Sequence, residues 1–243
     1  MAEYNQYSRE EVLHVLQARL RLEEDVLLRV DLAGTQLKGL VVARCTLRNA
    51  TLAGAALDDS RWEEALLQGV NLRKAALPGA LLEGCHLHGT DLIEADLTGA
   101  VIAGGRLDGC SLVNARLGGA VLTDVTFVAT DLYRADLRGA RLVHCRFRDP
   151  NLKAASLGRA RLQGATLIDC DLKEANLGEG DLSGAVLVSC DLRGVNAHQG
   201  VLAGATLVAC NAEGINLDGA HLRDLGHAET RFVHASTRGA RWE

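Results

Sequence analysis

Seven cysteines are the residues of this 243-residue chain that could most readily bind a metal or form disulfides. A structural zinc site needs ligands that converge on one point, commonly from cysteine pairs two to four residues apart. Here the cysteines fall at multiples of five residues, a spacing that brings no such group together. We therefore predict buried, free thiols that replace small core residues, and no metal, cofactor or disulfide. The seven are Cys45, Cys85, Cys110, Cys145, Cys170, Cys190 and Cys210.

A pair of neighbouring histidines is the second candidate for chemistry. His86 and His88 flank Leu87 and should point outward together, but two histidines do not complete a metal site. We interpret them as solvated surface residues. The chain has no G-x-S-x-G motif, no phosphate-binding G-x-x-x-x-G-K-S/T motif and no Cys-x-x-Cys motif. We therefore predict no catalytic residues and no enzymatic activity.

A five-residue repeat runs without insertion or deletion from Leu32 to Trp242 and explains these spacings. We name its central residue position i, and 32 of the 43 central residues are leucine. Position i−2 holds small residues, including all seven cysteines, and position i+2 holds 19 of the 26 glycines. Position i−1 is mostly Asp, Asn, Thr, Ser or Arg. Clear copies of the unit are residues 95–99 and 135–139.

A five-residue column stays buried only if the chain turns a corner in every repeat. On a helix the column would wander around the surface, and on a flat strand alternate repeats would point to opposite faces. A bend near i+2, where glycine permits unusual dihedrals, lets i−2 and i point inward while i−1 and i+1 point outward. Four sides then close a coil of about 20 residues, and coils stack about 4.8 Å apart. Leu92, Leu112 and Leu132 should therefore lie directly above one another.

The A-(D/N)-L-x-G unit resembles the pentapeptide repeat family over roughly residues 26–243. This resemblance implies an all-β fold, a right-handed quadrilateral parallel β-helix, for residues 26–243. Residues 1–25 form a separate N-terminal segment. Within it, residues 8–11 have a capping-box pattern, and apolar residues follow at helical spacing. We predict a short helix near residues 9–20 that covers the first coil, with Leu22 and Leu27 already in phase with the repeat.

Two features in the C-terminal half of the chain each lead to a prediction. The repeats run out at Thr237 and Trp242, so this end of the coil is a candidate for end-to-end homodimerisation, unless Trp242 itself covers it. Pro150 occupies an i−2 position and has no N–H group. We therefore predict an interruption of the sheet hydrogen bonds at Pro150.

Composition limits the class of function. The chain is 48% hydrophobic, only 3% aromatic, and has a formal net charge of -5. Such a chain is too apolar for disorder, and a general nucleic-acid binder would be basic. No apolar run reaches the length of a membrane span, and the N-terminus lacks the features of a signal peptide. We predict a cytoplasmic protein with neither a membrane nor a nucleic acid as direct partner.

Outward side chains give two candidate features. The short polar side chains at i−1, such as Asp91 and Asp131, are interpreted as caps of neighbouring backbone groups. Three adjacent coils also present β-branched pairs on one side, and a neighbouring side presents apolar i−1 residues. Strand propensity alone favours such residues, whereas contiguous exposed apolar area indicates a contact surface, and both explanations stay open. The candidate partner-binding residues are Thr166, Ile168, Val186, Val188, Thr206, Val208, Leu81, Val101 and Val121.

Two functions of different class fit a rigid rod. The first is a non-catalytic scaffold for protein–protein interaction. The N-terminal run resembles the helix that precedes the repeats in bacterial members of the family, and this implies a bacterial assembly such as a type VI secretion system. The second is a DNA mimic, because some members bind DNA gyrase or topoisomerase IV and protect against quinolones or a self-made toxin. The acidic net charge fits mimicry, whereas exposed arginines at 141, 146, 148 and 161 argue against it.

Overall fold

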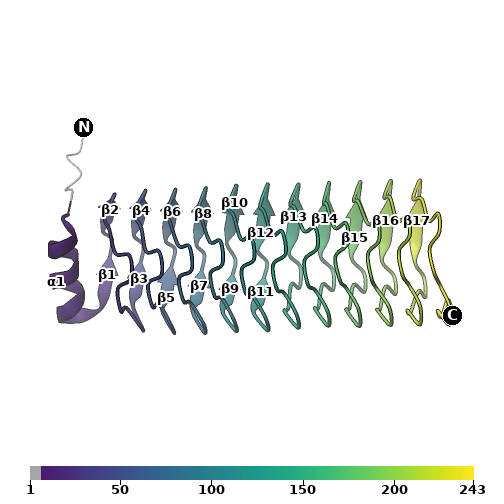
Figure 1. The fold of residues 1–243 in the computed structure, drawn as a ribbon, viewed down its shortest axis with the longest axis horizontal. Helices are drawn as coiled ribbons and strands as arrows, with labels where there is room; N and C mark the ends of the chain where they lie inside the picture. The colour runs from purple at the N-terminus through teal and green to yellow at the C-terminus, as the bar shows by residue number, and fades with distance from the viewer. Residues whose placement is uncertain (1–6) are drawn as a thin grey trace.

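The computed structural model describes residues 7–243, which form a short helix followed by a long, straight rod (Figure 1). After helix α1 (Arg9–Arg19) the backbone winds in coils, and each segment pairs in parallel with the segment 20 residues further along the chain. Every coil has four sides, and these stack into four faces of the rod. We number the faces 1–4 in chain order, starting from residues 21–23, 26–28, 31–33 and 36–38.

Faces 1 and 2 contain the regular strands, which form the lower and upper rows in Figure 1. Faces 3 and 4 are joined from coil to coil by single parallel bridges. The six strands of face 1 are β1 (Arg21–Glu23), β3 (Val41–Ala43), β5 (Arg61–Glu63), β7 (Leu81–Glu83), β9 (Val101–Ala103) and β11 (Val121–Thr123). The eleven strands of face 2 are β2 (Val26–Leu28), β4 (Thr46–Arg48), β6 (Leu66–Gln68), β8 (His86–His88), β10 (Arg106–Asp108), β12 (Thr126–Val128), β13 (Arg146–Arg148), β14 (Thr166–Ile168), β15 (Val186–Val188), β16 (Thr206–Val208) and β17 (Gly226–Ala228).

The central and i−2 residues form one continuous core along the axis of the rod. Leu92, Leu112 and Leu132 keep 3%, 0% and 1% of their surface exposed, and their preceding residues bridge one another in order. The predicted stacking of these leucines is therefore confirmed, and with it the quadrilateral parallel β-helix. Because the column contains mostly leucine and alanine, each coil buries the same kind of side chain as the coils on either side of it.

The corners explain the glycine column. Every i+2 residue from Glu24 to Gly239 has a positive φ, whether or not it is glycine. On faces 3 and 4 the backbone N–H of the residue at i+3 donates to the carbonyl of the residue at i, as in Ala95 N to Leu92 O at 3.0 Å. This bond and the positive φ are those of a type II turn, which favours glycine at that position.

The polar i−1 residues of faces 3 and 4 cap these turns. The Ile93 N–H donates to Asp91 Oδ1 at 3.0 Å, and the Thr98 N–H donates to Asp96 Oδ1 at 3.0 Å. The same bond recurs with Asp131, Asn151, Asp171, Asp191, Asn211, Asn176 and Asn216 as acceptors. The interpretation of this column as backbone caps is confirmed, since each side chain satisfies the N–H group at i+1 of its own coil.

Helix α1 covers the first coil, as predicted. The Ser8 side chain accepts from the Glu11 N–H while the Glu11 carboxylate accepts from the Ser8 N–H, which completes the capping box. Val12 and Leu16 are buried in the core that continues through the rod. The helix ends at Leu20 in a left-handed conformation, and β1 begins directly afterwards at Arg21 and pairs with β3.

The cysteines are all free and buried, but they do more than replace alanine. The Sγ of Cys110 donates to the carbonyl of Leu87, 23 residues earlier, at 3.4 Å, and the Thr90 hydroxyl makes the equivalent bond to Leu67 at 3.3 Å. In every bond of this type, the accepting carbonyl belongs to the central residue of a strand on face 1 or face 2, 23 residues before the donor. The other donors are Cys85, Thr130, Cys145, Cys170, Cys190, Cys210 and Thr230.

The prediction for Pro150 is wrong. The Asp171 N–H donates to the Pro150 carbonyl at 3.1 Å, the Asn151 N–H donates to Thr130 at 3.0 Å, and the pairing of β12, β13 and β14 continues past this point. The physical reason is local. In the described residues, the i−2 residues that follow face 2 donate no backbone hydrogen bond from their own N–H to another backbone group. A proline there removes no ladder bond.

Burial declines in the last coil. His227 and Thr237 are exposed, and Trp242 keeps 55% of its surface exposed. Trp242 lines an apolar hollow of about 190 Å³ together with Leu225 and Phe232. The homodimer expected at this end stays a prediction, and the mass of the protein in solution is its direct measurement.

Candidate protein-binding surface

The β-branched pairs predicted on three adjacent coils lie side by side on face 2. Strands β14, β15 and β16 pair in register, so that Thr166, Val186 and Thr206 form one row and Ile168, Val188 and Val208 form the other. Val186 is the most open of the apolar four, with 37% of its surface exposed, and the other three are half-buried. We name these six residues the β14–β16 strip.

The other three predicted residues form a separate surface. Leu81, Val101 and Val121 follow one another on β7, β9 and β11 of face 1, and Val101 keeps 36% of its surface exposed. They occupy earlier coils and a different face from the β14–β16 strip. The structure therefore divides the nine predicted residues into two patches and does not bring them together.

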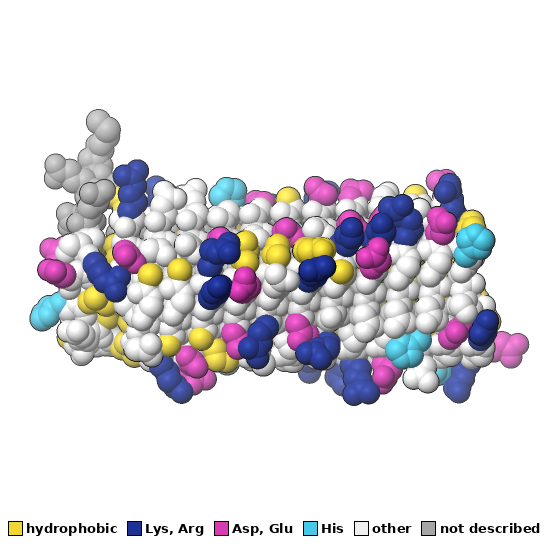
Figure 2. All heavy atoms as spheres, viewed as in Figure 1, with side chains coloured by type: hydrophobic (Ala, Val, Ile, Leu, Met, Phe, Trp, Pro, Cys, Tyr) yellow, Lys and Arg dark blue, Asp and Glu magenta, His cyan; other side chains and the backbone are white. Residues whose placement is uncertain are grey.

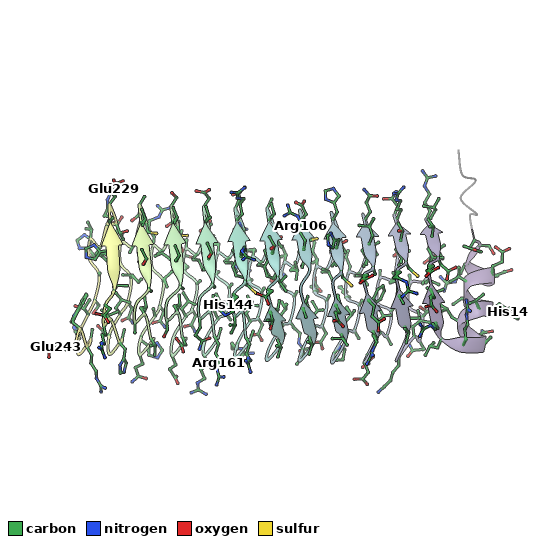
Figure 3. The ribbon with its side chains drawn as sticks, turned by 180° about the vertical axis from the view of Figure 1, so that it is seen from behind. His14, Arg106, His144, Arg161, Glu229 and Glu243 are labelled. Carbon is green, nitrogen blue, oxygen red and sulfur yellow. The ribbon has the colours of Figure 1, made fainter. Side chains whose placement is uncertain are left out.

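Four arginines border the β14–β16 strip, and the list of predicted binding residues omitted them. Arg146 and Arg148 project from β13, where they stand in register with Thr166 and Ile168. Arg141 and Arg161 follow each other on face 1 through a parallel bridge in the same two coils. All four are exposed. Figure 3 shows Arg161 at the lower edge of the rod, in its C-terminal half.

These four arginines make no ion pair within residues 7–243, whereas most other arginines pair with a nearby carboxylate. The neighbour of Arg161 along face 1 is Asp181. One Asp181 oxygen accepts from the Ser183 N–H at 2.9 Å, and the other accepts from Gln163 Nε2 at 2.6 Å. The carboxylate nearest along this face thus accepts hydrogen bonds from its own coil and from the one before it, and it forms no ion pair with Arg161.

The two histidines are exposed side chains on β8. Their register neighbours on β10 are Arg106 and Asp108, and the nearest charged contact places His88 Nδ1 3.9 Å from Asp108 Oδ2. Across residues 7–243, no cluster of three or more His, Cys, Asp or Glu side chains has the proximity that metal binding requires.

Charges of both signs are dispersed over the surface of the rod, with hydrophobic side chains between them (Figure 2). An open hollow of about 530 Å³ lies where face 1 turns into face 2, and its lining includes Arg44, Glu63, Glu64 and Glu83. Arg44 is held by ion pairs to Glu23 and Glu24 at 2.7 and 3.1 Å. The hydrogen bonds from Arg21 and Arg44 keep the pKa of Glu23 below its usual value. The Glu23 carboxylate therefore stays ionised and holds Arg44 in a structural ion pair.

Four segments, residues 65–104, 110–149, 151–187 and 185–224, match the sequence family described as Pentapeptide repeats, in eight copies. The chain belongs to this family. Among solved structures, HetL from the cyanobacterium Nostoc sp. strain PCC 7120, which is involved in heterocyst differentiation regulation, is 27% identical. The similarity covers 95% of both chains with a TM-score of 0.63.

Two other solved members of the family are more distant. A thylakoid-lumen protein of Arabidopsis thaliana is 24% identical, with a TM-score of 0.37 over 48% of this chain and 74% of its own. QnrB1, a plasmid-mediated fluoroquinolone resistance protein, is 18% identical in one of its structures, with a TM-score of 0.34 over 73% of this chain and 89% of its own. No curated protein sequence matches the chain. Within the part of the chain that the structure describes, no helix has the length and apolar character to cross a membrane.

Proposed function

We propose that this pentapeptide repeat protein is a non-catalytic scaffold that binds a protein partner through the β14–β16 strip. The observation that carries the proposal is the contrast within face 2. All its strands share one backbone conformation, yet β8 presents two histidines, β10 presents Arg106 and Asp108, and β13 presents two arginines. Strand conformation therefore does not require β-branched residues outside, and their concentration on β14–β16 supports a contact surface.

The rod suits such a role because its faces are already ordered. Each strand of the strip is hydrogen-bonded to strands on both sides, and the Leu167, Leu187 and Leu207 side chains beneath it are buried. Binding to a rigid surface costs less conformational entropy than binding to a flexible one.

Substitution of Val186 by lysine tests the proposal. A charge at the most exposed apolar position of the strip should abolish capture of the partner in a pull-down from the native host, because it must be desolvated at the centre of the contact. Val113→Lys, on face 3, is the control, since Val113 is a half-buried valine that also points outward but lies outside the strip. Equal recovery of the same proteins by wild type and both variants would contradict the proposal.

The gyrase-binding DNA mimic is the alternative prediction, and a supercoiling assay with purified gyrase decides it. The acidic net charge favours it, but the i−1 carboxylates of face 3 accept hydrogen bonds from their own backbone, and Asp191 also pairs with Arg193. Hydrogen bonds from Arg193 keep the pKa of Asp191 low, so its charge is present but partly neutralised. Protection of gyrase at micromolar protein would favour mimicry over the scaffold.

A further inference from the structure

The charge of the rod is locally reversed beside the β14–β16 strip. The coil formed by residues 141–160 contains five Lys or Arg residues and a single carboxylate, Asp149, although the whole chain carries a formal net charge of -5. Three of the five cations, Arg141, Arg146 and Arg148, point outward on faces 1 and 2, and Arg161 joins them from the next coil. Four exposed guanidinium groups thus gather on two adjoining faces.

These guanidinium groups lack intramolecular partners for structural reasons. The register neighbours of Arg146 and Arg148 are Thr126 and Val128 on one side and the β14–β16 strip on the other. Arg141 lies between Val121 and Arg161. The carboxylate beside Arg161, Asp181, is held by Gln163 and Ser183.

The arginine cluster and the strip form one continuous surface. Arg146 and Arg148 lie on β13, which belongs to the coil before β14 and pairs directly with β14. A ligand that lies along the strip therefore reaches them about 5 Å beyond β14. Beneath them, Phe147 is buried and stacks on Phe127 with 4.6 Å between ring centroids, which holds β13 in place. The surface is therefore apolar at one end and cationic at the other.

We propose that the partner is an acidic polypeptide whose apolar side chains lie on the β14–β16 strip and whose carboxylates bind Arg146 and Arg148, with Arg141 and Arg161 beside them. This inference rests on the proposed function and specifies the chemistry of its partner. Guanidinium groups bind carboxylates in bidentate geometry, and unpaired arginines next to an apolar contact supply charge complementarity. A nucleic-acid duplex presents mostly phosphates and sugars to the strip, and the remaining surface of an acidic rod would repel it.

Selection of a random 16-residue peptide library displayed on phage against the full chain tests this inference. We expect the selected peptides to place Asp or Glu next to a group of apolar residues, and to bind more weakly as salt is raised. Affinity of the synthesised peptides is then measured for Arg146→Gln/Arg148→Gln, for Arg141→Gln/Arg161→Gln and for Val186→Lys. Arg48→Gln is the matched control, because Arg48 is an exposed i+1 arginine of face 2 without an ion pair among the described residues.

The expected result is at least a tenfold rise in Kd for Arg146→Gln/Arg148→Gln and for Val186→Lys, a smaller rise for Arg141→Gln/Arg161→Gln, and no change for Arg48→Gln. Thermal melting of each variant checks that the rod is intact. Loss of binding with Val186→Lys but not with either arginine variant overturns the acidic partner and leaves the scaffold function standing. Peptides insensitive to all these variants, or no selected peptides, count against both. Binding of a 30-base-pair DNA duplex that depends on Arg146 and Arg148 but not on Val186 would assign the cluster to phosphate instead.

Discussion

The rings of Phe127 and Phe147 lie parallel in successive coils, with 4.6 Å between their centroids and 5° between their planes. Both occupy central positions of face 2, where β12 and β13 pair residue for residue, and they keep 1% and 3% of their surface exposed. The stacking follows from the repeat, since identical positions in parallel strands are held about 4.8 Å apart and two rings at that spacing must lie face to face. The pair supports the strand that carries Arg146 and Arg148.

This stacking predicts an interaction energy beyond the burial of each ring. Phe127→Leu and Phe147→Leu restore the residue found in most other coils, and each should lower the free energy of unfolding by about 0.5–3 kcal/mol. The double variant should lose about 0.5–1.5 kcal/mol less than the sum of the two, because the stacking contribution is removed only once. Urea denaturation of the four proteins measures this. Strict additivity would mean that the rings contribute only apolar area.

The Ser60 hydroxyl explains an exception in the i−2 column. It is buried, with 1% of its surface exposed, and accepts the indole N–H of Trp62 at 2.9 Å. Ser60→Ala restores the common residue of the column but leaves a buried donor without its partner, so it should lower the free energy of unfolding by about 1–3 kcal/mol. In a Trp62→Leu background the same substitution should cost almost nothing. A similar loss of stability in both backgrounds would show that the effect of Ser60 does not depend on its hydrogen bond with the Trp62 indole.

The positive φ of the i+2 corner predicts opposite effects for two reversed substitutions. Gly99 has a φ of +66°, and a Cβ there would meet no atom within 4 Å, so Gly99→Ala tests backbone strain alone. It should lower the free energy of unfolding by about 1–2 kcal/mol. Ala154 has a φ of 56° at the equivalent position, and Ala154→Gly should raise stability by about 0.5 kcal/mol after the entropy cost of glycine. Thermal melting of both variants gives the signs, and a stabilising Gly99→Ala would contradict the argument.

Much of this architecture is predictable because the period of the sequence fixes which side chains face inward. Leu92, the cysteine column and the helix over residues 9–19 follow from spacing and capping chemistry alone. The change of face 1 from strands, which end at β11, to single bridges from Arg141 onward is not predictable in this way. The repeat is unbroken there, although the bridged form closes its corners with a hydrogen bond from the i+3 N–H to the carbonyl at i, as in Ala165 N to Leu162 O at 3.0 Å.

The candidate surface was predictable only in part. Its β-branched strip is visible as a run of outward Thr, Ile and Val residues, but the role of the arginines depends on whether they have ion-pair partners. That depends on side chains such as Gln163, which occupies the carboxylate of Asp181 from the preceding coil. The sequence did carry one signal, the concentration of cationic residues in 141–160. For Pro150 the sequence suggested a defect that the structure does not have. The missing N–H of a proline disrupts a sheet only at positions whose N–H donates a hydrogen bond to a neighbouring coil.

The buried thiols predict a loss of stability in alkali. Burial raises the pKa of Cys85 to about 11 and that of Cys145 to about 12, from 9.0 for a solvated cysteine thiol. The folded protein therefore keeps these protons at a pH where the unfolded chain releases them. Since the folded pKa is the higher one, the contribution to stability is complete below about pH 9 and is lost as the pH rises towards 12.

Cys145→Ala isolates this effect, because alanine is the common residue of the column and does not ionise. Each buried thiol adds up to about 1.4 kcal/mol of destabilisation per pH unit in this window, so wild type should lose about 1 kcal/mol more than Cys145→Ala between pH 9 and pH 10. Urea denaturation at the two pH values measures the difference, and the titration of lysine and tyrosine cancels because both proteins share it. If wild type and Cys145→Ala showed the same pH dependence, Cys145 would have to ionise in the folded rod. In that case Cys145 of the native protein should react with a thiol reagent at pH 9 as fast as a cysteine in an unfolded control peptide.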